Sequence, residues 1–418
     1  MDSLEGKPNG PIQINFRKIK ILINGRSVVP TNLQLILDDD LSISLSWHLK
    51  DLLREFSISN EITLVSIDDS TPQQFLIINH NYGFQDGESF VAKPAQEPIL
   101  VQGVAAHEIH AVLVNAPNLS FKNSSIVFDL GNCHATVKAF EHSRDSFRSL
   151  PRYGALKTIT HSIHARIVNG HPIEGKEAFN LLSPIASFLG FVKGSRIGIG
   201  QIEGIGDAVL PAFREIGFRK SDTLKGSTNW YYPTLDTDLP GLFQQYRLLN
   251  ANPAGRDTLN RALHYYQASN QSQADATEVA ILLSVAGLEA LSHYVLSKRA
   301  DLSKTQLKNS KLSETLRAAY SFLGLTDDPV SQSPALQARI FDSKKPDYDA
   351  FRLIADFRNG LVHPIGFKYH GREMFELWLV SQWLIEVTVL RLLDHKGKYQ
   401  DRRRQIGSWA GALYDMPI

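Results

Sequence analysis

Near the end of the chain lies a 20-residue run, "MFELWLVSQWLIEVTVLRLL" (Met374–Leu393), that limits the possible architectures more than any other segment. Its residues are apolar nearly all round a helix, with interruptions at Glu376, Gln382, Glu386 and Arg391. Charges near the middle of a span are costly in lipid, so the run predicts a buried helix. Such a helix needs neighbours on most sides. Either a monomeric bundle or a second copy of the chain could supply them.

The hydrophobic period changes about halfway along the chain. Short β-branched segments bounded by Gly, Asn and Pro predict strands, and Asn24-Gly25 predicts a hairpin turn. These segments are 18–30, 75–84, 107–116, 124–140 and 157–170, with one helix expected over 174–194. Five segments of helical period follow: 256–270, 274–300, 311–324, 346–363 and 374–393. We therefore expect an α+β protein, in which a β-rich N-terminal module (1–240) precedes an all-α helical bundle (241–418). The boundary is expected near Tyr231–Leu242.

Composition narrows the class of protein. With 43% hydrophobic and 21% charged residues, the 418-residue chain resembles a soluble globular protein of two or three domains. The formal net charge of +1 argues against a wholly basic surface for nonspecific nucleic-acid binding, although a local basic site remains possible. The single cysteine, Cys133, excludes an intramolecular disulfide and fits a reducing compartment. No apolar signal-peptide core is visible at the N-terminus, so we expect a cytoplasmic protein that does not enter a membrane.

Several motifs in the first half are more simply structural. The pairs His107/His110 and His161/His164 lack the i, i+4 spacing of a helical zinc site and fall on expected strands, where solvated histidines are the default. "SRIGIGQIEGIGD" (195–207) is expected to be strand or turn, and "GIGQIEG" (198–204) within it departs from the dinucleotide-binding fingerprint and is interpreted as a turn. "LDDDL" (37–41) is interpreted as a polar turn. No metal or cofactor is expected.

The stretch "DFRNGLVHP" (356–364) carries the sharpest chemical pattern. Its apolar positions predict a helix that continues to about His363, and Pro364 should end it there. Asn359 and His363 then share one helical face, within reach of the long Arg358 side chain. Histidine can move a proton near neutral pH and arginine can hold a phosphate, so the trio suits metal-free cleavage of a phosphodiester. The alternative is a histidine favoured by the helix dipole beside an arginine in an ordinary ion pair.

Two further features bear on this site. Glu289 falls on the same helical stripe as Leu282, Val285, Ala286 and Leu296, where a carboxylate needs a partner. Arg358 is the candidate partner, so Glu289 is predicted to support the site. A basic run, "KGKYQDRRR", is predicted to line a groove that binds RNA, unless it is only a solvated end. Its cations are Lys396, Lys398, Arg402, Arg403 and Arg404.

The R-x4-H string at a helix end within a helical C-terminal domain resembles the HEPN superfamily. "LLSVAGLEALSHYVL", "FRNGLVHP" and "VLRLLDHKGKYQDR", in that order, are similar to the ApeA-type HEPN domain of bacterial defence proteins. The resemblance covers roughly residues 242–405. Gly360 lies inside the motif, and because glycine is a poor helix former it is expected to loosen the helix there.

This resemblance implies a metal-independent endoribonuclease that acts in prokaryotic antiviral defence or stress. His363 would be the acid or base, Arg358 the phosphate ligand, Asn359 a positioning residue and Glu289 the helix acid. Active members typically complete the site across a homodimer of the HEPN domain. The N-terminal module would sense a phage or cellular trigger. Some HEPN domains are noncatalytic, so a dimerisation or RNA-binding module remains the alternative.

Overall fold

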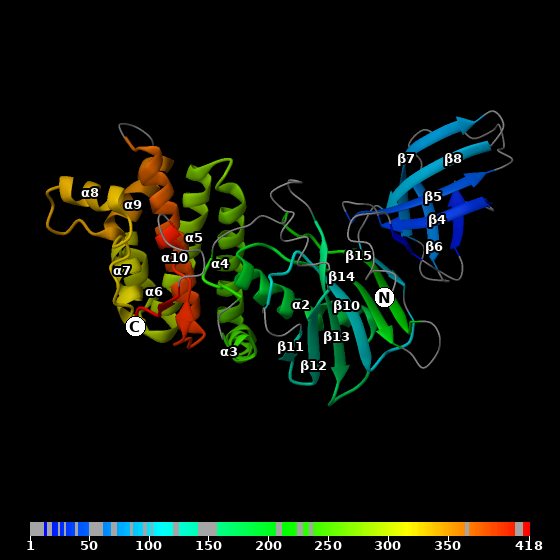
Figure 1. Cartoon of the computed structure of the whole chain (residues 1–418), viewed down its shortest axis with the longest axis horizontal. Coiled ribbons are helices and arrows are strands. Elements are labelled where there is room, and N and C mark those ends of the chain that lie inside the picture. Colours follow the sequence, from blue (N-terminus) through cyan, green and yellow to red (C-terminus); the bar gives the residue numbers. More distant parts are fainter. Residues whose placement is uncertain are drawn as a thin grey trace. The chain divides into compact units, whose positions relative to one another are not determined.

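The structure is a computed structural model that describes residues 12–14, 19–23, 26–28, 31–37, 41–49, 62–67, 73–83, 87–94, 98–101, 103–119, 125–140, 157–205, 211–223, 229–233, 237–363, 368–405 and 413–418. The chain forms two compact units, each described here by itself. The first contains most of the chain up to Lys225, and the second is formed mainly by Gly226–Ile418 together with Ser187–Arg196. The first is rich in β-sheet and the second is helical, so the predicted α+β class is confirmed (Figure 1).

The first unit begins with an eight-stranded antiparallel sheet of order β1-β4-β5-β8-β7-β6-β2-β3. Ile23 of β2 lies opposite Arg26 of β3, so the predicted pairing of these two segments is confirmed, while the turn residues Asn24 and Gly25 lie outside the described residues. Alternate residues Ile43, Leu45 and Trp47 of β5 are fully buried, as expected for a strand with one covered face. The strands are β1 (Ile12–Ile14), β2 (Ile19–Ile23), β3 (Arg26–Val28), β4 (Thr31–Leu37), β5 (Ile43–Leu49), β6 (Ile62–Ile67), β7 (Gln73–Gly83) and β8 (Gly87–Pro94). The acidic turn at Asp38–Asp40 lies outside the described residues.

A second antiparallel sheet has the order β11-β12-β13-β10-β14-β15-β9. Its strands are β9 (Ile99–Val101), β10 (Glu108–Val114), β11 (Ser125–Asp129), β12 (Cys133–Ala139), β13 (Ile159–Ile167), β14 (Gly198–Ile205) and β15 (Phe213–Phe218). The predicted helix is α2 (Gly175–Lys193), and it ends before Gly194, whose φ of +78° suits glycine.

Two interpretations of this region are wrong. "GIGQIEG" is not a turn but most of strand β14. Its glycines allow close approach, since a Cβ on Gly200 would lie 2.0 Å from the carbonyl oxygen of Gly217. His161 is fully buried in β13, whereas His164 is exposed and lies 3.3 Å from a carboxylate oxygen of Glu108. The two histidines were predicted to be alike, but they lie on opposite faces of strand β13, one buried and one exposed.

The second unit is a helical bundle with a small C-terminal strand pair. Its elements are α3 (Leu239–Ala251), α4 (Pro253–Ser272), α5 (Thr277–Tyr294), a π-helical turn η1 (Val295–Arg299), α6 (Lys304–Asn309), α7 (Leu312–Phe322), α8 (Pro334–Asp342), α9 (Ala350–Val362), α10 (Gly371–Leu392), β16 (Lys398–Tyr399), a 3-10 turn η2 (Arg402–Gln405) and β17 (Tyr414–Asp415). The five predicted helical segments correspond to α4, α5, α7, α9 and α10, while α3, α6 and α8 were not predicted.

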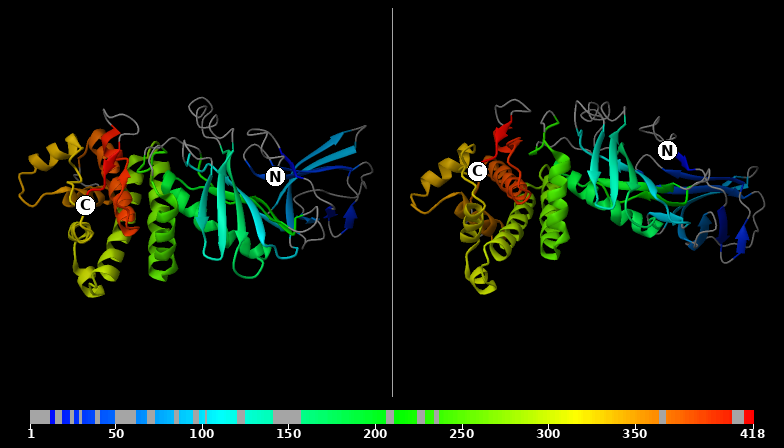
Figure 2. Two further views of the ribbon diagram at one scale, coloured as in Figure 1. Left: turned by 60° about the horizontal axis from the view of Figure 1, so that its bottom comes forward. Right: turned by 90° about the horizontal axis from the view of Figure 1, so that it is seen from below.

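Helix α10 is the buried centre of this bundle. It contacts α4, α5, α8 and η2, and its orange-red ribbon lies among the other helices of the bundle in both views (Figure 2). Nearly every residue from Glu373 to Leu390 is buried. Because one chain already covers this helix, its apolar surface does not require a second copy. The prediction of a homodimer therefore loses this support and depends on the family resemblance.

The four polar residues that interrupt the apolar run of α10 (Glu376, Gln382, Glu386 and Arg391) each meet a partner. Gln382 donates a hydrogen bond to Ser284 Oγ (2.8 Å), and Arg391 donates to the carbonyl oxygen of Leu323 at the end of α7 (2.8 Å). Glu376 accepts from the backbone N–H of Ala335 (2.8 Å) at the start of α8. Glu386 is paired with Arg402, as described below. These bonds offset the cost of burying polar groups and fix the positions of α5, α7 and α8 around α10.

Among the described residues, the helical stretch Thr277–Arg299 is long and apolar enough to cross a membrane. It includes α5 and packs against α4, α7, α9 and α10. Most of it is buried within the bundle, as in the core helix of a soluble protein.

Candidate functional site

The R-x4-H motif lies on the last turn of α9, and Asp349 fixes the start of that helix. One carboxylate oxygen of Asp349 accepts a hydrogen bond from the backbone N–H of Arg352 (2.9 Å), and the other accepts from Arg317 Nε (2.7 Å). Burial by itself would raise the pKa of Asp349, but these bonds outweigh it and lower the pKa. The predicted helix end at His363 is confirmed, and Gly360 does not interrupt α9.

Arg358, Asn359 and His363 lie at the surface of this helix end. Asn359 and His363 are exposed and Arg358 is half-buried. Arg358 Nη1 donates a hydrogen bond to Asn359 Oδ1 (3.2 Å), which turns the guanidinium towards the face that carries Asn359 and, one turn later, His363. Among the described residues no carboxylate pairs with Arg358, so the alternative of an ordinary ion pair has no support there. The helix end thus offers a cation, an amide and an imidazole to solvent.

Glu289 does not join this group, which corrects the prediction that it pairs with Arg358. It is half-buried and lines a pocket between α4 and α5, to which α9 contributes no residue. No hydrogen bond or ion pair joins it to Arg358 or His363 within the described ranges. Its stripe lies at the margin of the core, since Leu282 and Ala286 are only half-buried. The other polar residues of this pocket were not predicted from the sequence, although His293 lies four residues after Glu289, on the same helical face, and could have indicated the pocket.

The C-terminal basic run divides into buried and exposed residues. Arg402 and Arg403 are 0% and 2% exposed, so the prediction that they bind RNA is corrected: they are structural. Arg402 Nη2 donates to Glu386 Oε1 (2.6 Å), which also accepts from the hydroxyl of Tyr266 (2.6 Å). Burial raises the pKa of Glu386, and Arg402 opposes that shift. A string of adjacent arginines suggested a solvated surface, but Arg402 pairs with the buried Glu386 and Arg403 pairs with Asp401 and Asp327, so both guanidinium groups are buried.

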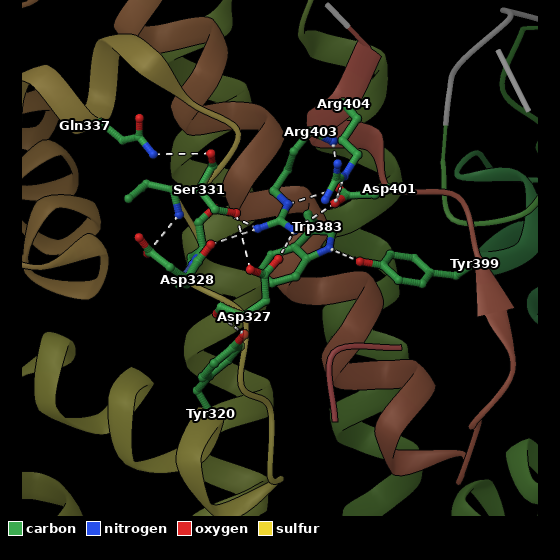
Figure 3. A network of polar contacts seen from close by, with 12 residues as sticks. Tyr320, Asp327, Asp328, Ser331, Gln337, Trp383, Tyr399, Asp401, Arg403 and Arg404 are labelled. Atoms are coloured by element: carbon green, nitrogen blue, oxygen red, sulfur yellow. Dashed lines mark hydrogen bonds and ion pairs between the residues drawn. The ribbon is translucent and has the colours of Figure 1, made fainter. Parts of the chain in front are cut away.

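Arg403 lies at the centre of a network of hydrogen bonds and ion pairs (Figure 3). Its Nε and Nη2 donate to the two oxygens of Asp401 (3.0 and 2.7 Å), and Nη2 also donates to Asp327 (2.5 Å). Nη1 donates to the carbonyl oxygens of Asp328 and Pro329, each at 3.1 Å. The guanidinium carbon lies 3.5 Å from the ring centre of Trp383. Burial by itself would lower the pKa of Arg403, but the two carboxylates outweigh it and raise the pKa, so the side chain stays charged.

The remaining basic residues are accessible. Lys396 and Lys398 are exposed and line a pocket of about 600 Å³ between the start of α3 and the segment after α10. His395 lies beside them, and burial lowers its pKa. Arg404 is half-buried and its guanidinium carbon lies 4.1 Å from the ring centre of Tyr414. Lys396 and Lys398 are thus accessible to solvent, and Lys396 Nζ lies 3.5 Å from a carboxylate oxygen of Asp394.

Within the described part of the chain, no group of three or more His, Cys, Asp and Glu side chains is arranged to hold a metal ion. The α9 site contributes one imidazole and no carboxylate. Its chemistry, as drawn from these residues, is acid or base transfer and anion binding.

Comparison with known families matches residues 252–415 to the YopA C-terminal domain. The matched segment runs from the start of α4 to β17, so it contains α9, α10 and the pocket between α4 and α5. The helical part of this chain is therefore similar to that domain, whose description names no activity. No curated protein and no solved structure matches the chain.

Proposed function

We propose that the helical unit is a metal-independent endoribonuclease of the HEPN type. The observation that supports this most directly is the Arg358–Asn359 hydrogen bond, which turns a guanidinium without a described carboxylate partner towards Asn359, four residues before the exposed His363. A free arginine is suited to phosphate, which it can bind through two N–H groups. An exposed histidine is suited to proton transfer near neutral pH.

The proposed reaction is a transesterification within RNA. His363 removes the proton from a 2′-hydroxyl, the 2′-oxygen bonds to the adjacent phosphorus, and the bond from phosphorus to the 5′-oxygen breaks. The 5′-oxygen takes a proton from water as it leaves, and protonated His363 returns its proton to solvent, so the products are a 2′,3′-cyclic phosphate and a 5′-hydroxyl. Arg358 stabilises negative charge on the phosphoryl oxygens, and Asn359 positions Arg358. Glu289 has no part in this step.

The test is incubation of the purified full-length protein with total RNA in excess EDTA. We expect cleavage by the wild type and a loss on the order of 10²–10⁴ in rate for His363→Ala and Arg358→Ala. Arg352→Ala is the matched control and should cleave normally, because Arg352 is a half-buried arginine of α9, like Arg358, but is paired with Asp356. Cleavage by a folded His363→Ala protein at the wild-type rate, or loss of activity in EDTA, would overturn the assignment. Binding of RNA without cleavage would instead indicate the noncatalytic alternative.

The wider setting is part of the same proposal. Lys396 and Lys398 would draw RNA towards the helical unit, and two copies would pair through this unit to bring their sites together. The β-rich unit would sense a phage or cellular trigger, and the protein would act in the cytoplasm of a prokaryotic cell as a defence or stress effector.

A further inference from the structure

A pocket of about 530 Å³ lies between α4 and α5, within the size range of small-ligand sites. All its lining residues come from α4, α5 and the π-helical turn η1. It is therefore a different site from the end of α9, and nothing in the reaction proposed above uses it. The two helices lie side by side in the bundle (Figure 1).

Small side chains create the hollow. Ala254 and Thr258 of α4 and Ala286 and Ala290 of α5 contribute to the lining. The two helices themselves stay close, since a Cβ on Gly287 would lie 3.5 Å from the Cβ of Tyr265. At the far end α5 continues into η1, which supplies Ser297 and Lys298 to the pocket. Single π-helical turns of this kind are frequent at functional sites.

Charged groups of both signs border this hollow without pairing. Arg261 and Lys298 are cations, Asp257 and Glu289 are carboxylates, and His293 lies one turn after Glu289. In the part of the chain that the structure describes, none of these five makes a side-chain hydrogen bond or ion pair. Tyr265 adds a half-buried aromatic ring to the same lining. Unpaired donors and acceptors around one hollow suit a ligand that carries both an anion and hydrogen-bond donors.

We propose that the pocket between α4 and α5 binds a nucleotide unit. Arg261 and Lys298 would hold the phosphate, because a guanidinium and an ammonium are the usual protein ligands of that group. Glu289 would accept hydrogen bonds from the ribose hydroxyls, as carboxylates do in dinucleotide sites. Tyr265 offers a ring for the base to stack on, a contact that tolerates any base. The unit has two possible sources, a free mononucleotide and one residue of an RNA strand.

The experiment is isothermal titration of the full-length protein with AMP, GMP, CMP and UMP. We expect binding by the wild type and a dissociation constant raised on the order of tenfold or more by Arg261→Met, which removes a charged donor but keeps the apolar stem. Arg256→Met is the matched control, because Arg256 is an exposed arginine of α4 that does not line the pocket. Glu289→Gln should weaken the binding of AMP more than the binding of 2′-deoxy-AMP, since the deoxy form lacks one of the ribose hydroxyls that Glu289 would bind.

Further arms separate the two sources and the two sites. If an RNA oligomer displaces AMP, and Arg261→Met weakens the binding of that oligomer, the source is an RNA strand. If AMP binds and the oligomer does not compete with it, the source is a free nucleotide. Nucleotide binding should survive His363→Ala, so failure at α9 leaves this inference standing. Absence of binding of the four nucleotides and the RNA at millimolar concentration would overturn it. Equal binding by the wild type and the Arg261→Met protein would do the same.

Discussion

Replacing Arg403 with methionine tests whether the buried arginine contacts hold the end of the chain on the bundle. All five N–H donors of this guanidinium are used, three of them on residues 327–329 and two on Asp401, and the group stacks on Trp383. The change would leave the buried carboxylate of Asp401 without its main partner. Removal of one member of a buried pair costs about 3–5 kcal/mol.

The loss should lie towards the lower end of that range. Asp401 keeps a longer contact with Arg404 Nε (3.5 Å), and the carboxylate of Asp327 is one-third exposed, so water can solvate it. A loss of about 3 kcal/mol is still a large part of the 5–15 kcal/mol by which domains are usually stable. Arg403→Lys should recover only part of it, because an ammonium has three donors and no planar face.

The assay is urea unfolding followed by tryptophan fluorescence, since Trp230, Trp378 and Trp383 all belong to the helical unit. The midpoint should fall while the slope stays unchanged. Arg352→Met is the matched control: its ion pair with Asp356 (3.4 Å) is solvated, so its loss should cost about 0–1 kcal/mol. If Arg403→Met cost no more than Arg352→Met, the assignment of Arg403 to the stability of this fold would be wrong.

Four other predictions concern other parts of the molecule. Asp349→Asn keeps the helix cap but removes the charge that stabilises the start of α9, so it should lower the free energy of unfolding by about 0.5–1 kcal/mol at pH 7. Because the folded-state pKa of Asp349 is lowered, this loss of stability should shrink as pH falls below 3.8 and through that lowered pKa. A loss that stays constant down to pH 2 would contradict this prediction. Burial raises the pKa of Cys133 to about 11, so Ellman's reagent at pH 8 should react slowly with the folded protein and quickly in urea; rapid reaction without urea would show the thiol to be accessible. Lys396→Gln/Lys398→Gln should weaken RNA binding and reduce its salt dependence, and an unchanged salt slope would remove these lysines from the RNA path. Light scattering should give twice the 46.7 kDa chain mass if the helical units pair, whereas the mass of one chain, with and without RNA, would exclude the homodimer.

The sequence by itself determined the features that depend on neighbours along the chain. The change of hydrophobic period predicted the sheet-rich and helical units, Asn24-Gly25 predicted the β2–β3 hairpin, and the pattern before Pro364 predicted the end of α9 at His363. These features follow from local backbone preference and from the spacing of apolar residues, which a single sequence displays directly. The i, i+4 relation of Asn359 and His363 followed from the same helical period.

Only the tertiary structure decided which charged side chains meet. Arg402 and Arg403 are adjacent to exposed lysines in the sequence, yet Glu386 and Asp327 draw them into the bundle. Glu289 was assigned to Arg358, yet it borders a pocket with Arg261 of the neighbouring helix. Arg403 and Asp327 are 76 residues apart, and no local pattern connects them. A charge becomes buried when a distant segment supplies its counter-charge, and that supply depends on how the helices pack.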